Sequence, residues 1–308
     1  MTLGLAGSAP LARMSRTTAA WLAFSFTFTL TAARIAAAGD NLLGLPAKAV
    51  ENEGALLIHG GGPLSDDVFD AFVGLAGGKD ARIVLIPTAY PFRDLEHMRN
   101  YFSAWFDLEV ASFDVLDAHS AEEAKDDEFA RPLREATGVW IGGGAQGKLA
   151  DTYLETEVAT AIRGVVERGG VVGGTSAGAS FLSKVMIRGG SRSEARVGVG
   201  LGLLEKAVVD QHFLQRSRQE RLLGVVRDHA GLIGVGVDYR AALVVQGDRM
   251  RVLGESSVVV CTGASKVSEG WIRTLQPGDE AELVAVEADA NADDEADTVA
   301  LVLDGDDR

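Results

Sequence analysis

Short apolar runs alternate with segments whose apolar positions recur at helical spacing along the first half of the chain. The runs that predict buried strands cover 55–59, 82–87, 110–116, 138–141 and 170–173. The segments that predict amphipathic helices cover 66–75, 94–106 and 155–167. Strands that are apolar throughout are typical of parallel sheets covered on both faces. The pattern therefore predicts an α/β fold with a mostly parallel sheet and helices on both faces.

The second half of the chain is richer in strands. It predicts a helix near 217–228 and strands at 207–209, 232–237, 241–246, 249–253 and 257–261. Acidic residues crowd the sequence from Asp279 onward. The segment 287–297 is typical of a solvated loop between two terminal strands. No internal repeat is evident.

The first 38 residues differ from the rest of the chain. Arg13 and Arg16 precede an apolar stretch from Thr18 to about Ala33, and small residues follow at 36–38. This order of a basic region, an apolar region and small residues predicts a secretory signal peptide over 1–38, and hence a secreted or periplasmic protein. The stretch is shorter than the roughly 20 residues of a spanning helix, so we expect no stable membrane span after cleavage. An uncleaved membrane anchor is the alternative, and 39–53 is expected to be a linker.

Charge and cysteine content exclude several classes of function. The 308-residue chain has a formal net charge of -15, and removing 1–38 makes it more acidic. A surface of this sign argues against nucleic acid or anionic lipid as a partner. Cys261 is the single cysteine, so no internal disulfide can form. The five histidines are scattered, with no spacing typical of a metal site, and we expect neither a metal nor another cofactor.

Glycine-rich turns follow three of the predicted parallel strands, at 60–62, 142–144 and 173–174. The carboxyl ends of parallel strands share one edge of the sheet, where ligands bind in folds of this kind. Glycines there would let a ligand approach the backbone closely. The sequence therefore predicts a site at this edge.

Ser176 is the candidate nucleophile at that edge. Residues 174–178 match G-x-S-x-G between a predicted strand and a predicted helix, which is the context of a nucleophile elbow. The backbone N–H of Ala177 would face a developing oxyanion, and a second donor would come from Gly144. A purely structural turn is the alternative, because a chain with 37 glycines can match this pattern by chance.

His212 is the candidate general base. It follows the predicted strand 207–209 within Asp-Gln-His-Phe, so we expect it at the same edge as Ser176. A lone histidine is more often structural than catalytic, and the residues alone leave that alternative open.

Several motifs together resemble the cyanophycinase and dipeptidase E family of serine peptidases, and the resemblance covers roughly 54–276. The matching segments are LLIHGGG (56–62), RIVLIPTA (82–89), GVWIGGGAQ (138–146), GGTSAGAS (173–180), GLGLLEKAVVDQHFLQRSRQERL (200–222) and GLIGVGVDYRAALVVQGDR (231–249). The resemblance implies a class I glutamine amidotransferase-like, or flavodoxin-like, three-layer sandwich. It makes 54–276 the peptidase domain, with the acidic strands and loop of 277–308 expected as part of the same domain.

The same resemblance implies the roles of the site residues. Ser176 would be the nucleophile and His212 its base, without a cofactor. The positions expected to shape a pocket for cyanophycin or aspartyl dipeptides are Gln146, Asp210, Arg216, Arg218 and Arg221. Arginine suits such substrates because a guanidinium binds a carboxylate through two parallel hydrogen bonds. Asp210 would alternatively receive an arginine side chain of the substrate. The oligomeric state is open, a homodimer included.

The chain departs from the family at the third member of the triad. Family members usually read Asp-Glu where this chain reads Asp238-Tyr239, and the glutamate orients the histidine. A tyrosine is neutral near pH 7 and cannot stabilise an imidazolium as a carboxylate does. Loss of the carboxylate in a serine protease costs about 10⁴-fold in turnover. Support for His212 is therefore expected from Asp238, from Glu194 or from a hydrogen bond of Tyr239.

Two other functions follow from these departures. A catalytically impaired pseudo-peptidase, which binds a peptide or another ligand, is the runner-up because of Tyr239. An amidotransferase-type hydrolase is a weaker alternative, because position 176 holds serine where a cysteine nucleophile is expected.

Overall fold

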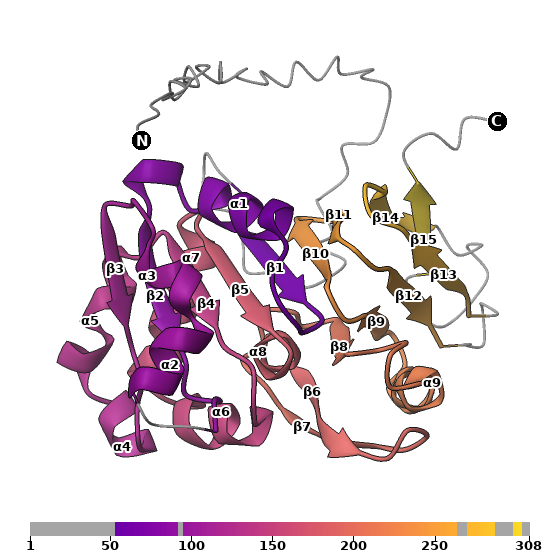
Figure 1. The fold of residues 1–308 in the computed structure, drawn as a ribbon. Helices are drawn as coiled ribbons and strands as arrows, with labels where there is room; N and C mark the ends of the chain where they lie inside the picture. The colour runs from indigo at the N-terminus through magenta and orange to yellow at the C-terminus, as the bar shows by residue number, and fades with distance from the viewer. Residues whose placement is uncertain (1–52, 92–94, 264–269, 287–297, 304–308) are drawn as a thin grey trace, which may run out of the picture. The chain divides into compact units, whose positions relative to one another are not determined.

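Five parallel strands form one side of the main sheet, from β1 in the middle to β3 at the edge (Figure 1). They are β1 (Ala55–His59), β2 (Arg82–Ile86), β3 (Ser112–Val115), β4 (Gly138–Ile141) and β5 (Val171–Thr175). The computed structural model describes residues 53–91, 95–263, 270–286 and 298–303. The segments predicted as a signal peptide (1–38), a linker (39–53, except Glu53) and a solvated loop (287–297) lie outside these residues. None of the described helices is long and apolar enough to cross a membrane.

The main sheet is extended by antiparallel strands beyond β1. These are β10 (Ala241–Gln246), β11 (Arg249–Gly254), β14 (Glu280–Val286) and β15 (Thr298–Leu303). The order among the described strands is β15-β14-β11-β10-β1-β5-β4-β2-β3. The mixed sheet with its flanking helices confirms the predicted α/β class. Register is continuous across the centre, where Leu57 of β1 pairs with Gly173 of β5.

Alternate residues of each strand face opposite layers of helices. Leu56 and Ile58 of β1 belong to one apolar core, and Leu57 belongs to another. The first core is shared with helices α5 (Asp127–Glu135), α6 (Gln146–Tyr153), α7 (Glu157–Glu167) and α8 (Ala177–Phe181). The second is shared with α1 (Asp66–Leu75) and α3 (Ser103–Phe106). Burial on both faces explains why these strands are apolar at nearly every position.

A second sheet carries the strand that leads to His212. It contains β8 (Ala207–Gln211), β9 (Ile233–Val237), β12 (Val258–Thr262) and β13 (Ile272–Leu275), with β8 and β9 parallel. One face joins the core of the main sheet, while α9 (Gln219–Asp228) covers the other face. The expectation that β8 ends at the edge of the same sheet as β5 is therefore wrong. The two sheets pack against each other through the first core, to which residues of both contribute.

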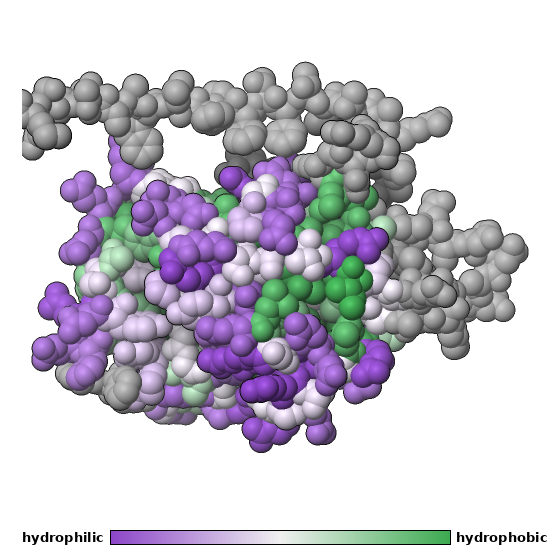
Figure 2. All heavy atoms as spheres, turned by 45° about the vertical axis from the view of Figure 1, so that its right-hand side comes forward, coloured by the Kyte–Doolittle hydropathy of each residue, from purple (hydrophilic) through white to green (hydrophobic). Residues whose placement is uncertain are grey.

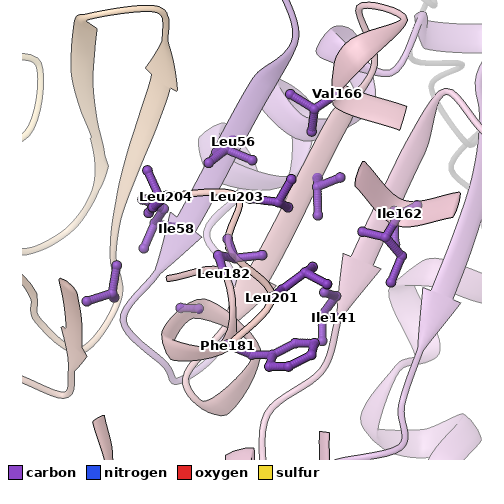
Figure 3. Packing of buried hydrophobic residues seen from close by; sticks show 14 of the residues in the cluster. Leu56, Ile58, Ile141, Ile162, Val166, Phe181, Leu182, Leu201, Leu203 and Leu204 are labelled. Carbon is purple, nitrogen blue, oxygen red and sulfur yellow. The ribbon is translucent and has the colours of Figure 1, made fainter. Parts of the chain in front are cut away.

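The connection after α8 holds that helix in place. A hairpin of β6 (Val185–Gly190) and β7 (Ala195–Val199) follows α8 and leads into residues 201–204. Leu201, Leu203 and Leu204 pack around Phe181 and Leu182 at the end of α8 (Figure 3). This packing positions the short helix, and with it the serine that precedes it.

The coarse prediction changes in detail. The helix expected over 94–106 is two helices, α2 (Leu95–Tyr101) and α3. Helices α5 and α6, a helical turn at 121–124 and the β6–β7 hairpin were not predicted. The two helices are separated at Phe102, whose backbone leaves the helical conformation, and Trp105 of α3 packs 5.0 Å from the ring of Trp140 in the second core. The remaining elements are α4 (Ala121–Ala124) and a 3-10 turn at Gly78–Asp80.

Candidate active site

Ser176 occupies a strained turn between β5 and α8. Its backbone has φ 51° and ψ -107°, a conformation that a residue with a side chain seldom adopts. Close approach requires the flanking glycines. A Cβ at Gly178 would lie 2.2 Å from the carbonyl oxygen of Ile141, and one at Gly174 would lie 2.5 Å from the carbonyl carbon of Gly178. The G-x-S-x-G pattern thus forms the tight turn expected of it.

His212 lies within hydrogen-bond distance of that serine. The Oγ atom of Ser176 is 3.0 Å from Nε2 of His212, although β5 and β8 belong to different sheets. The loop after β1 bridges the sheets, because the backbone N–H of His212 donates to the carbonyl of Gly60 at 2.9 Å. Gly61 leaves room for the ring, since a Cβ there would lie 2.4 Å from Cε1 of His212. The structure therefore brings the two principal candidates together.

The other ring nitrogen contacts a residue that the sequence analysis missed. Nδ1 of His212 lies 3.1 Å from Oε1 of Gln215. Gln215 follows His212 by three residues, and the N–H of Arg216 donates to the carbonyl of His212 in the same turn. The signal in the sequence is this three-residue spacing, because a turn after the strand brings side chains at that spacing together. The sequence leads us to expect support for His212 from Asp238, Glu194 or Tyr239, and not from the amide of Gln215.

The three residues proposed to support His212 lie elsewhere around it. Asp238 accepts the backbone N–H of Gln215 at 2.8 Å and the hydroxyl of Ser256 at 3.0 Å. Tyr239 stacks on the imidazole, with ring centroids 5.7 Å apart and an interplanar angle of 29°. Glu194 is exposed beside the β6–β7 turn, where its backbone N–H donates to Ser191. Among the described residues, none of these three hydrogen-bonds to the ring.

Burial keeps His212 neutral. The pKa of its ring is lowered to about 4, first by burial and then by the positive charges of Arg216 and Arg218. The hydrogen bond to Gln215 and the charge of Asp238 act in the opposite direction. A neutral imidazole is the form that can accept a proton from serine.

A second histidine is buried next to the site. His59 ends β1, has no solvent exposure, and its Nδ1 lies 2.8 Å from Oγ1 of Thr175. Its pKa is lowered to about 3 by burial and by the nearby His212. The carbonyl of His59 accepts the N–H of Ser176 at 2.9 Å, so this residue supports the elbow through its backbone.

The arginines after His212 differ in their environment. Arg221 is 3% exposed, and its Nε and Nη2 lie 2.6 and 2.5 Å from the two carboxylate oxygens of the fully buried Asp210. Arg218 contacts the same carboxylate at 3.4 Å and the carbonyl of Gln211 at 2.5 Å. Asp210 therefore binds two arginines of its own chain, and the alternative that it receives a substrate arginine is not supported. Arg216 is exposed and has no hydrogen-bond or ion-pair partner for its side chain in the described ranges.

A basic pocket lies beside the Ser176–His212 pair. Its volume is about 360 Å³. It is lined by Gly190, Ser191, Arg192, Gln215, Arg216, Arg218 and Arg221. Arg192, from the β6–β7 turn, was not among the predicted pocket residues. Like Arg216, its side chain has no partner in the part of the chain that the structure describes. Two guanidinium groups are thus available to an anionic ligand.

Gln146 lies at a different pocket from these arginines. Its side-chain amide donates to the carbonyl of Ile187 at 3.0 Å. It lines a cavity of about 520 Å³ together with Arg188, Arg196 and Val197. The structure therefore does not place Gln146 among the lining residues of the pocket beside Gln215.

Backbone donors are available next to the nucleophile. Ala177 is the first residue of α8, so its N–H has no acceptor within the helix. Of the glycines after β4, Gly143 is the one that faces the serine, since a Cβ there would lie 3.3 Å from Cβ of Ser176. A Cβ at Gly144 would instead meet the carbonyl of Ala89. The geometry therefore brings Gly143 into the candidate oxyanion site next to the predicted Gly144.

A further pocket lies on the side of α9 and β13. It has a volume of about 670 Å³ and includes Leu223, Val226, Trp271 and Ile272. Figure 2, which turns the right-hand side of Figure 1 forward, shows hydrophobic residues gathered beside strongly hydrophilic ones. The lining of this pocket includes neither Ser176 nor His212. Within the described ranges, no cluster of three or more His, Cys, Asp or Glu could hold a metal ion.

Comparisons with known proteins identify the family of the chain. The sequence model of peptidase family S51 matches residues 56–253. The cyanophycinase of Synechococcus elongatus is 35% identical over 202 residues, which are 63% of this chain and 62% of that protein. The cyanophycinase of Geminocystis herdmanii (strain PCC 6308) is 32% identical over 205 residues, 64% of this chain and 75% of that protein. The match thus spans less than two thirds of the length of the first of these relatives.

A solved structure shows the same fold. The crystal structure of a peptidase from an acI-B1 Actinobacterium superposes with a TM-score of 0.60 at 23% identity. The superposition covers 74% of this chain and 96% of that one.

Proposed function

The chain belongs to peptidase family S51, and from that premise we propose that it is a serine-type hydrolase in which Ser176 attacks the carbonyl carbon of a peptide. The observation that carries the proposal is the 3.0 Å contact between Oγ of Ser176 and Nε2 of His212. The strained elbow holds that hydroxyl, and the lowered pKa of His212 keeps the base unprotonated.

Each step has a candidate group. As Oγ of Ser176 bonds to the carbonyl carbon, its proton passes to Nε2 of His212. The N–H groups of Ala177 and of Gly143 or Gly144 would stabilise the oxyanion of the tetrahedral intermediate. His212 then returns the proton to the leaving amine as the peptide bond breaks. Water then attacks the acyl carbon as Nε2 of His212 takes one of its protons, and that proton passes to Oγ of Ser176 as the ester bond breaks and the acid leaves.

The substrate that we propose carries carboxylates, as cyanophycin-like chains and aspartyl peptides do. The basic pocket beside His212 supports this class, because Arg192 and Arg216 have no ion-pair partner in the described part of the chain. Arginine binds carboxylates in a planar, two-bond geometry. The relatives named cyanophycinase support the same class.

The test compares the protein with its Ser176→Ala variant on cyanophycin, on a β-aspartyl dipeptide and on an α-aspartyl dipeptide. We expect hydrolysis of at least one substrate by the native protein and none by the variant. The exposed Ser103→Ala variant serves as the matched control and should retain full activity. Equal rates from the native protein and Ser176→Ala would refute the nucleophile. Calorimetric binding of these peptides without turnover would instead support the impaired pseudo-peptidase.

The role of the pocket has its own test. Replacing Arg216 by Ala should raise KM for peptides with a free aspartyl carboxylate. It should leave KM unchanged for the matching asparaginyl peptides, because these lack the charge. An equal rise for both series would contradict carboxylate recognition.

We also propose that the protein acts after export, in the periplasm or outside the cell. The order of charged, apolar and small residues in 1–38 supports this. N-terminal sequencing of the protein purified from the periplasm or medium should find a start near residue 39. A start within the first 20 residues would contradict it.

A further inference from the structure

We propose that Gln215 is the positioning residue of His212: its side-chain carbonyl holds Nδ1–H of the ring, so that Nε2 stays free to take the proton of Ser176. The inference rests on the function proposed above, and it assigns to an amide the task that the family gives to a glutamate. Three features of the site lead to it, namely the tautomer that catalysis needs, the anchoring of Gln215 and the position of Tyr239.

The tautomer of the ring is the first feature. A neutral imidazole has one N–H, and it can accept the hydroxyl proton of Ser176 at Nε2 only if that proton is on Nδ1. Nδ1–H then needs an acceptor. Oε1 of Gln215 lies 3.1 Å from Nδ1, while Nε2 lies 3.0 Å from the serine hydroxyl. Both edges of the ring are therefore satisfied in the one tautomer that suits a general base.

The anchoring of Gln215 is the second feature. Its backbone N–H donates to Oδ1 of Asp238 at 2.8 Å, and the hydroxyl of Ser256 holds the other oxygen of that carboxylate at 3.0 Å. Asp238 is only 9% exposed and directly follows β9, the parallel neighbour of β8. A line of contacts thus runs from Ser256 through Asp238, Gln215 and His212 to Ser176. The carboxylate acts on the ring only through the backbone of Gln215 and through its charge.

The position of Tyr239 is the third feature. Its ring stacks on a face of the imidazole at 5.7 Å, and a Cβ at Gly62 would lie 2.6 Å from its Cζ. Stacked in this way, Tyr239 covers a face of the ring and leaves the Nδ1 edge to Gln215. Tyr239, at the position where the family has its acid, therefore packs against His212. The orientation of the ring is left to Gln215, three residues after His212.

An amide and a carboxylate differ in one consequence. Through Oε1 the amide accepts the Nδ1 proton as a carboxylate does, but only the carboxylate carries a charge that stabilises the imidazolium. Gln215→Glu should therefore keep the tautomer and raise the pKa of His212. Gln215→Leu should lose the acceptor while keeping a side chain of similar size.

The experiment uses the full chain labelled with ¹⁵N-histidine, with the signals of His212 assigned by their loss in His212→Ala. Two quantities are measured: the tautomer of His212 from its ring ¹⁵N shifts, and the rate at which a fluorophosphonate labels Ser176 between pH 3 and 9. The variants are Gln215→Leu and Gln215→Glu. Gln219→Leu, an exposed glutamine of α9, is the matched control. Thermal unfolding of each variant verifies that it is folded.

We expect the native protein and Gln219→Leu to hold the Nδ1–H tautomer and to label at the same rate. Gln215→Leu should populate the Nε2–H tautomer and label at least about 10-fold more slowly, because the wrong tautomer costs roughly 10⁴-fold in turnover in a serine protease. Gln215→Glu should keep the Nδ1–H tautomer and move the acid midpoint of labelling upward by about 1 pH unit or more.

The proposal is overturned if Gln215→Leu keeps both the native tautomer and the native labelling rate, or if the midpoint of Gln215→Glu does not move. These failures are distinct from failure of the proposed function. Labelling of Ser176 that is insensitive to Gln215 would retain the hydrolase and remove the positioning role. A native protein that is never labelled, but whose tautomer changes in Gln215→Leu, would retain the role of Gln215 and remove the hydrolase.

Discussion

Arg221 and Arg216 line the same pocket, but removing Arg221 should destabilise the folded protein while removing Arg216 should not. Arg221 is 3% exposed and makes two hydrogen bonds with the carboxylate of Asp210, which is 0% exposed. In Arg221→Met that carboxylate stays buried, and its remaining cationic contact is Nη1 of Arg218 at 3.4 Å.

The magnitude follows from the cost of breaking a buried ion pair. Removing one partner of such a pair costs about 3–5 kcal/mol, because the other charge is left buried without compensation. In a domain of this size each kcal/mol lowers Tm by about 2–4 °C. Arg221→Met should therefore lower Tm by roughly 6–20 °C.

The assay is thermal and urea unfolding followed by circular dichroism at pH 7.5. Arg216→Met is the control, because Arg216 is exposed and should change the free energy of unfolding by no more than about 0.5 kcal/mol. The double variant Arg221→Met/Asp210→Asn should recover part of the loss, since the buried charge is removed with its partner. A single variant Arg221→Met within about 0.5 kcal/mol of the native protein would refute this reasoning.

Three further predictions concern the elbow and the two buried histidines. Gly178→Ala should lower the free energy of unfolding in urea by more than about 3 kcal/mol, because its Cβ would lie 2.2 Å from the carbonyl oxygen of Ile141. Gly74→Ala, in open space within α1, should instead raise it by up to about 1 kcal/mol, and equal effects would contradict the packing of the elbow. The rate of fluorophosphonate labelling should fall on acidification with a midpoint near pH 4, the lowered pKa of His212. A midpoint at the ordinary value of 6.5 would contradict the lowered pKa. Since His59 stays neutral down to about pH 3 when folded but protonates near 6.5 when unfolded, it should lower stability as the pH drops below 6.5, contributing about 2 kcal/mol of the loss at pH 5. His59→Gln should flatten this loss in pH-dependent urea titrations, and an unchanged slope would contradict it. Among the described residues, the charged and titratable groups that face His212 are Arg216, Arg218, Asp238, His59 and Tyr239.

The central strands and the elbow could be predicted because their signals are local. A strand buried on both faces must be apolar throughout, and 55–59, 138–141 and 170–173 show this in a few residues. The sharp turn at Ser176 needs glycines at fixed positions around it, so its pattern is also short. Helical spacing likewise identified α1 and α7.

Long-range arrangements could not be predicted from such signals. Nothing in the apolar run before His212 distinguishes a strand of the main sheet from one of a second sheet. The two sheets are joined by a hydrogen bond from the N–H of His212 to the carbonyl of Gly60. This bond is between backbone atoms, so the identity of the side chains does not indicate it. The arginines show the same limit. The sequence predicts one role for Arg216 and Arg221, but in the structure Arg221 is buried and Arg216 is exposed.

Gln215 was missed for a chemical reason. Of the groups that can orient a histidine, only an acid stabilises the imidazolium by charge, which favoured Asp238 and Glu194 in the sequence. An acceptor that only fixes the tautomer can be a neutral amide. The spacing of three residues between His212 and Gln215 indicates a contact only if a turn follows β8, and the structure has this turn.

The most direct test of the account is the site at which a fluorophosphonate reacts with the native chain. The account predicts a single adduct in the intact mass, located on Ser176 by peptide sequencing. That adduct should be absent from Ser176→Ala and should form far more slowly in His212→Ala. A native protein that acquires no adduct at pH 7.5, or a Ser176→Ala variant that is labelled as fast as the native protein, would contradict the claim that Ser176 and His212 form a nucleophile and its base.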